Sequence, residues 1–147
     1  MGEQESEGDA VMKKVWVDAN VILRYLLKDH EEFFRKTQKI MLEAEQGKIK
    51  LLVAPITIAE VLWTLESFYK IPRKEIADVL SAFICSDGIE AEEGDVVLFA
   101  LKTYKENNVD FIDAYLSHHM AKLENNKIFT FDKKRFSRLD MEILNTD

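Results

Sequence analysis

The sequence predicts an α/β fold, with a three-layer α/β/α arrangement around a small, mostly parallel sheet. Short apolar runs that suit buried strands alternate with longer segments whose apolar residues recur at helical spacing. That alternation is typical of parallel strands joined by helices. The helical segments account for much more of the chain than the strands, which is why the sheet is expected to be small.

The predicted elements follow one another with turn residues between them. Strands are expected where apolar runs are bounded by polar or turn residues, at residues 15–17, 49–53, 128–131 and 141–144, with a short one near Ile89. Helices are expected where apolar residues recur every three or four positions, at residues 21–27, 31–46, 57–69, 73–83, 92–107 and 110–125. Gly47 is expected to end the second helix and Pro72 to open the fourth.

Length and composition predict one domain. Residues 1–12 are acidic and polar and are expected to form a flexible N-terminal segment, and either Met1 or Met12 could be the start. Residues 13–147 are long enough for a single core, and the 47% hydrophobic content excludes a disordered chain.

Charge and cysteine content narrow the function classes. A net charge of −7 argues against a protein that coats nucleic acid, although an enzyme could still contact phosphate through a local basic patch. No apolar stretch approaches the ~20 residues of a membrane span. Cys85 is the only cysteine, so no internal disulfide can form, and a cytoplasmic location is the natural interpretation. Cys85 lies in an apolar run and is expected to be buried as a small hydrophobic residue.

Four carboxylates lie where predicted strands end or predicted helices begin. Asp18 and Asp132 directly follow apolar strands, whereas Glu60 and Asp113 fall in the first turns of helices. In an open parallel sheet these positions share one edge, so the four acids are expected to meet in one pocket. Crowded carboxylates repel each other unless a cation lies between them. Oxygen ligands without His or Cys indicate Mg²⁺ or Mn²⁺, as one ion or two.

Helix capping is an alternative role for the first two acids. Asp18 could cap the helix that follows it, although Asn20 could do so alone and leave Asp18 to point out of the strand end. Thr57 and Glu60 have the spacing of a capping box, which by itself favours a structural role for Glu60.

The last two acids are harder to explain by capping. Asp110 is a good N-cap, so a second acid at Asp113, flanked by apolar residues, is more than the helix requires. Asp132 could lie in a solvated turn or could be a fourth ligand beside a basic cluster. The candidates for contact with substrate phosphate groups are Arg24, Lys133, Lys134, Arg135 and Arg138.

Four segments resemble PIN-domain ribonucleases, including the VapC toxins of toxin–antitoxin pairs. They are residues 17–27, 59–63, 109–114 and 129–136, and the resemblance extends over about residues 14–144. It implies an endoribonuclease that depends on Mg²⁺ or Mn²⁺, with an RNA substrate, a homodimeric state and an antitoxin protein as partner. The catalytic metal ligands it implies are Asp18, Glu60, Asp113 and Asp132, with Asp110 as an additional ligand and Asn20 and Thr130 as supporting residues. Ala19 departs from the pattern, because the family more often has a hydroxyl residue there.

Two alternatives stay open. A PIN-like domain could serve as a non-catalytic scaffold or as a subunit of an RNA-processing assembly. A more remote alternative is the phospho-acceptor receiver domain, which is also acidic and doubly wound. Receiver domains need adjacent acids after the first strand, whereas this strand is followed by Asp18, Ala19 and Asn20.

Overall fold

The computed structural model describes residues 12–145, and its contacts divide the chain into two compact units. The first unit comprises Met1–Val61 and Phe83–Glu92, and the second comprises Leu62–Ala82 and Glu93–Asp147. Each unit is described by itself below. The predicted N-terminal segment, apart from Met12, lies outside the described residues, and the single domain over residues 13–147 stays a prediction.

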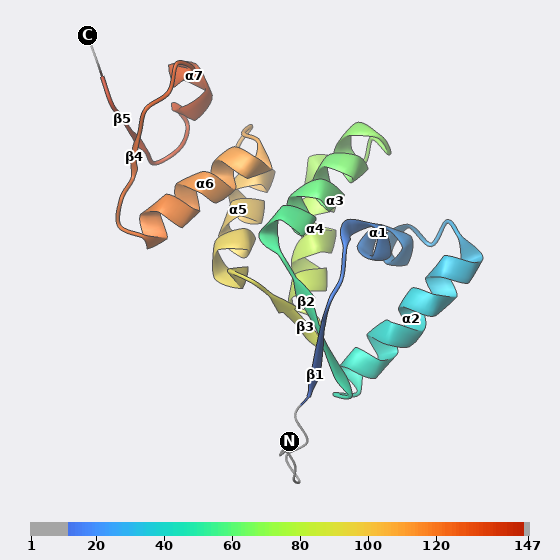
Figure 1. Cartoon of the computed structure of the whole chain (residues 1–147). Coiled ribbons are helices and arrows are strands. Elements are labelled where there is room, and N and C mark those ends of the chain that lie inside the picture. Colours follow the sequence, from blue (N-terminus) through green and yellow to red (C-terminus); the bar gives the residue numbers. More distant parts are fainter. Residues whose placement is uncertain (1–11, 146–147) are drawn as a thin grey trace. The chain divides into compact units, whose positions relative to one another are not determined.

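The first unit contains a three-stranded parallel sheet in the order β1-β2-β3 (Figure 1). The strands are β1 (Lys13–Trp16), β2 (Ile49–Val53) and β3 (Ile89–Ala91). Helices α1 (Ala19–Leu27) and α2 (Glu31–Glu45) connect β1 to β2, while α3 (Pro55–Ser67) and α4 (Arg73–Ile84) connect β2 to β3. Parallel strands need such crossovers, because a tight turn can join only antiparallel neighbours.

The core of the first unit forms where α2 packs against the sheet. Ala44 of α2 and Ile49 and Leu51 of β2 are buried together. The partly buried side chains that pack against them are Val15, Val17, Ile40, Met41 and Ile89. Ile49 and Leu51 are two positions apart, so both point to the same face of β2, and this is the face that α2 covers.

Two glycines with positive φ form a matched pair for a stability test. Gly47 ends α2 with φ +81°, and a Cβ there would meet no described atom within 4 Å. Gly88 has φ +83°, but a Cβ there would collide with the backbone carbonyl and Cβ of Ala44. We expect Gly47→Ala to lower the free energy of unfolding by about 1–2 kcal/mol through backbone strain. Gly88→Ala should lower it by roughly a further 1–3 kcal/mol through overpacking. Urea denaturation measures both, and equal losses would contradict the close approach of Gly88 to α2.

The second unit is built on the helix pair α5 (Gly94–Glu106) and α6 (Phe111–Lys122). Apolar side chains of both helices are fully or almost fully buried, namely Val96, Val97, Ala100, Leu101, Tyr104, Phe111 and Ala114. After α6 come β4 (Lys127–Ile128), α7 (Lys133–Phe136) and β5 (Glu142–Ile143). The strands β4 and β5 pair in parallel as a separate two-stranded sheet (Figure 1).

Most predicted elements are confirmed, and the differences have physical causes. The strand at residues 49–53 matches β2, but the strand predicted at residues 128–131 is shorter, because Phe129 and Phe131 are exposed and lie outside β4. The prediction that Cys85 is buried was wrong, because it is exposed just after α4 ends. Within residues 12–145 no helix has the length and apolar character that crossing a membrane requires.

Candidate functional site

Asp18 is the N-cap of α1. Its backbone is extended, and its Oδ1 atom accepts a hydrogen bond of 3.1 Å from the backbone N–H of Val21. The alternative in which Asn20 caps this helix alone is therefore wrong, since Asn20 lies inside the first turn of α1. The cap bond uses one carboxylate oxygen, and the exposed side chain retains a second oxygen for another ligand.

Glu60 is not part of a capping box. Helix α3 begins at Pro55, two residues before the predicted start, and the backbone N–H groups of Thr57 and Ile58 both donate to the carbonyl of Ala54. Proline suits a first helical position, because its missing N–H would have no partner inside the helix anyway. Glu60 thus lies beyond the first turn, exposed on α3, and capping does not explain an acid there.

Asp113 is a buried carboxylate that is bound by an arginine. It lies in the first turn of α6 and is 3% exposed. Arg135 donates from Nε to Oδ2 and from Nη2 to Oδ1, each at 2.7 Å, so both oxygens have a strong partner. The hydrogen bond and the charge of Asp113 raise the pKa of Arg135. A buried carboxylate without such a cation would destabilise the fold by several kcal/mol, roughly 3–5.

Asp132 and Thr130 shape the segment that carries Arg135. The backbone N–H of Asp132 donates to Thr130 Oγ1 at 3.0 Å, and Asp132 Oδ1 accepts from the backbone N–H of Arg135 at 3.1 Å. Asp132 is thereby the N-cap of the four-residue helix α7. The first of these bonds fixes the backbone next to the Asp132 carboxylate, and the supporting role of Thr130 in a metal site stays a prediction.

A cavity of about 290 Å³ in the second unit brings acids and bases together. Its lining residues come from the α5–α6 turn, the start of α6, and α7 with the residues that follow it: Asn108, Val109, Asp110, Asp113, Lys134, Arg135, Ser137 and Arg138. Asp110 holds the N-cap position of α6 but makes no side-chain cap hydrogen bond. The cavity therefore places two carboxylates beside three basic side chains, and basic side chains suit phosphate oxygens.

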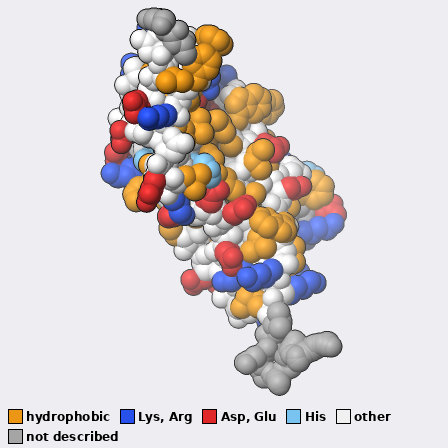
Figure 2. All heavy atoms as spheres, turned by 60° about the vertical axis from the view of Figure 1, so that its left-hand side comes forward, with side chains coloured by type: hydrophobic (Ala, Val, Ile, Leu, Met, Phe, Trp, Pro, Cys, Tyr) orange, Lys and Arg blue, Asp and Glu red, His pale blue; other side chains and the backbone are white. Residues whose placement is uncertain are grey.

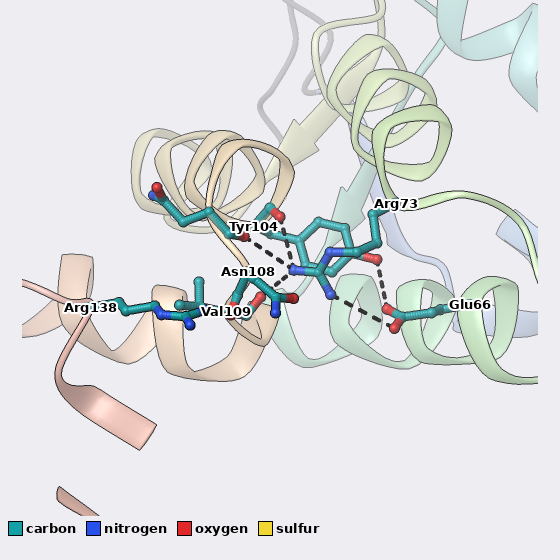
Figure 3. Close-up of polar contacts among 7 residues, drawn as sticks. Glu66, Arg73, Tyr104, Asn108, Val109 and Arg138 are labelled. Atoms are coloured by element: carbon teal, nitrogen blue, oxygen red, sulfur yellow. Dashed lines mark hydrogen bonds and ion pairs between the residues drawn. The ribbon is translucent and has the colours of Figure 1, made fainter. Parts of the chain in front are cut away.

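A second arginine fixes the turn that leads into α6 (Figure 3). Arg73 donates to the carbonyls of Tyr104, at 2.9 Å, and Val109, and its guanidinium lies 3.8 Å from the centre of the Tyr104 ring. Glu66 completes the cluster by accepting from the Tyr104 hydroxyl at 2.6 Å and pairing with Arg73. Burial, followed by this hydrogen bond, raises the pKa of Tyr104. We define Glu66, Arg73 and Tyr104 as the Arg73 cluster.

No residue pattern in the sequence indicates the Arg73 cluster. Arg73 was predicted only as a residue near the start of a helix, and its main acceptors are backbone carbonyls more than thirty positions away. Arg138 donates to the Asn108 carbonyl at 3.1 Å in the same turn. Carbonyl acceptors leave no mark in the residue types, so only the fold reveals these contacts.

The donor set of the predicted metal site is divided between the units. Asp18 and Glu60 belong to the first unit, and Asp110, Asp113 and Asp132 to the second. Within neither unit do the described residues contain a group of three or more His, Cys, Asp or Glu side chains that could hold a metal ion. The chemistry of the set nevertheless suits Mg²⁺ or Mn²⁺, since every donor is a carboxylate and Asp113 already binds a cation through both oxygens.

The predicted phosphate contacts differ in their surroundings. Lys133, Lys134, Arg135 and Arg138 are exposed on or just after α7. Arg24 is instead held in an ion pair with Asp29, at 2.9 Å between Nη1 and Oδ1, and its side chain is only 19% exposed. Because Arg24 is paired with Asp29, less of its positive charge is available to a phosphate group.

Comparison with known proteins gives two matches. The chain matches the model of the PIN domain family over residues 15–142. It is 26% identical over 129 residues to a VapC ribonuclease of Aquifex aeolicus (strain VF5), an alignment that covers 88% of this chain and 94% of the relative. The matched span contains all five acids of the candidate site.

Proposed function

Because the chain belongs to the PIN-domain family, we propose that it is a metal-dependent endoribonuclease and the toxin of a toxin–antitoxin pair. The PIN-domain family has the α/β fold class that the sequence predicts. The seven helices and the parallel strands of the described residues agree with it. The proposed substrate follows the similarity to a VapC ribonuclease.

The observation that carries the proposal is a pair of carboxylates at the start of α6, in a cavity that basic side chains also line. Asp113 is almost fully buried although capping does not require it, and Asp110 lines the same cavity without making a cap bond. Buried charge destabilises a fold unless it is paired, and functional sites are where such groups gather. Lys134 and Arg138 line the same cavity and can bind phosphate oxygens.

The residues have separate roles in the proposal. Asp18, Glu60, Asp113 and Asp132 hold one or two Mg²⁺ or Mn²⁺ ions, with Asp110 as an additional ligand and Asn20 and Thr130 in support. When bound, the ion would activate water and stabilise negative charge on the phosphate group. Asp18 and Asp132 already hold defined orientations through their cap bonds. Preorganised ligands of this kind avoid the reorganisation that metal binding otherwise requires.

The RNA is proposed to be contacted by a small group of basic side chains rather than by the whole surface of the protein. The basic side chains on and after α7, Lys133, Lys134 and Arg138, bind phosphates near the cleaved bond. Figure 2 shows a face on which acidic and basic side chains are interspersed, and the net charge of the whole chain is −7. Such a surface gives little general attraction for RNA, so single-stranded segments that fit the local contacts are the favoured substrates. The toxin role further implies a cytoplasmic homodimer and an antitoxin protein that blocks the site.

Cleavage of a fluorescent single-stranded RNA tests the activity. We expect cleavage with Mn²⁺ or Mg²⁺, complete loss on adding a chelator, and recovery when the ion is restored in excess. The same sequence as DNA serves as the substrate control. Cleavage that persists in chelator would refute the metal mechanism. Folded protein that binds Mn²⁺ but cuts no RNA in a broad panel would favour the non-catalytic scaffold instead.

A further inference from the structure

We propose that Arg135 is an exchangeable cation: it occupies Asp113 before metal is bound and binds a phosphate group of the RNA once Asp113 ligates the ion. The inference rests on the proposed function and specifies how substrate binding at that site is coupled to metal. It gives Arg135 two partners that it contacts at different stages, rather than one structural partner.

The geometry shows why the two cations exclude each other. Arg135 makes two parallel hydrogen bonds of 2.7 Å and thereby uses both oxygens of Asp113. A divalent ion needs at least one of those oxygens, and the like charges of the ion and the guanidinium repel at such short range. Metal binding and the Arg135 contact at Asp113 are therefore in competition.

Burial shows which partner moves. The Asp113 side chain is 4% exposed and sits in the first turn of α6, whereas the Arg135 side chain is 48% exposed. The backbone of α7 is anchored by the Asp132 cap and by Phe136, which is buried. Arg135 can thus leave Asp113 by side-chain rotation alone, while the helix that carries it stays in place.

The surroundings provide the second partner of Arg135. Lys134 and Arg138 line the same cavity, so a phosphate group held there would lie within a cluster of cations. A guanidinium binds phosphate in the same two-pronged geometry that it uses for a carboxylate. Once metal neutralises Asp113, Arg135 contributes its charge to the substrate instead.

The exchange predicts opposite effects of one substitution on two ligands. Arg135→Gln removes the competitor at Asp113, so Mn²⁺ should bind at least about fivefold more tightly, the lower end of ordinary coupling between sites. Binding of a single-stranded phosphorothioate RNA in the presence of Mn²⁺ should weaken by a similar factor or more, about fivefold. An arginine that is only structural would make both affinities worse when it is replaced.

The experiment is a Mn²⁺ titration by electron paramagnetic resonance, with RNA binding by fluorescence anisotropy, on the full chain. Lys134→Gln is the matched control, because it lies in the same cavity and should weaken RNA binding without changing Mn²⁺ affinity. Arg135→Lys covers the case in which the Gln variant fails to fold: it keeps the charge but loses the two-pronged contact, and should also bind Mn²⁺ more tightly. A second readout is the rise in melting temperature on adding Mn²⁺, which should be larger in both Arg135 variants than in the wild type.

The outcomes separate this inference from the proposed function. Unchanged or weaker Mn²⁺ affinity in the Arg135 variants overturns the exchange, provided that the wild type binds Mn²⁺ and Asp113→Asn does not. If the wild type binds no Mn²⁺, or if Asp113→Asn binds it as well as the wild type, the metal site itself is wrong and the exchange fails with it.

Discussion

Asp18→Asn is expected to abolish most metal-dependent RNA cleavage while leaving the stability of the protein almost unchanged. Asn is as good an N-cap as Asp, so its amide oxygen can still accept the hydrogen bond from Val21. The amide carries no charge and is a poor ligand for a divalent ion. The cleavage rate should fall by about 10²–10³-fold, as when one charge-stabilising group is removed from an active site, while the free energy of unfolding changes by less than about 0.5 kcal/mol.

Two comparison variants make this result specific. Asp18→Ala should lose the same activity but also about 1 kcal/mol of stability, because it removes the cap. Asp140→Asn removes an exposed acid outside the candidate site and should retain activity. Rates are measured with the fluorescent RNA and stabilities by urea denaturation. If Asp18→Asn cleaves RNA at the wild-type rate, Asp18 is only a cap and the proposed ligand set is wrong.

Arg73→Ala is expected to lower the free energy of unfolding by about 3 kcal/mol or more. The substitution removes hydrogen bonds to the carbonyls of Tyr104 and Val109, the stacking on the Tyr104 ring, and the ion pair with Glu66. The carbonyls would be left without their charged donor. The turn before Asp110 should then open more often, which hydrogen exchange at the amides of residues 107–110 would detect.

Matched variants distinguish the Arg73 cluster from a general effect of substitution in α4. Lys74→Ala changes the exposed neighbour and should alter the free energy of unfolding by less than about 0.5 kcal/mol. Tyr104→Phe removes only the hydroxyl that donates to Glu66 and should lose about 1 kcal/mol. An Arg73→Ala protein as stable as Lys74→Ala would show that the carbonyl contacts contribute little.

The sequence predicted the fold well where one local signal acted alone. The strand at residues 49–53 is an apolar run closed by turn residues, and β2 has those bounds. Where two local signals disagreed, the predicted helix start was wrong. Thr57 and Glu60 have the spacing of a capping box, but the helix begins earlier, at Pro55. The apolar run after Ile128 also misled, because alternating phenylalanines suggest burial that Phe131, at 94% exposed, does not have.

Long-range contacts account for what the sequence could not predict. The residues after Asp132 show only a basic run, and nothing local indicates that Arg135 binds an acid 22 positions earlier. The carbonyl acceptors of Arg73 have no residue-type signature at all. Asp18, Asp113 and Asp132 could be proposed as ligands from the sequence, because they lie at the starts of helices, where ligand sites of parallel sheets occur. That the acids share a metal ion stays a prediction.

The proposed function requires that Asp18, Glu60, Asp113 and Asp132 bind the same ion or ion pair. Anomalous scattering from crystals grown with Mn²⁺ tests it most directly, because the signal locates manganese without reference to the protein. We expect one peak, or two about 4 Å apart, with ligands from these four carboxylates and with Arg135 no longer bonded to both oxygens of Asp113. Manganese bound elsewhere, or Asp18 and Asp113 on no shared ion or ion pair, would contradict it.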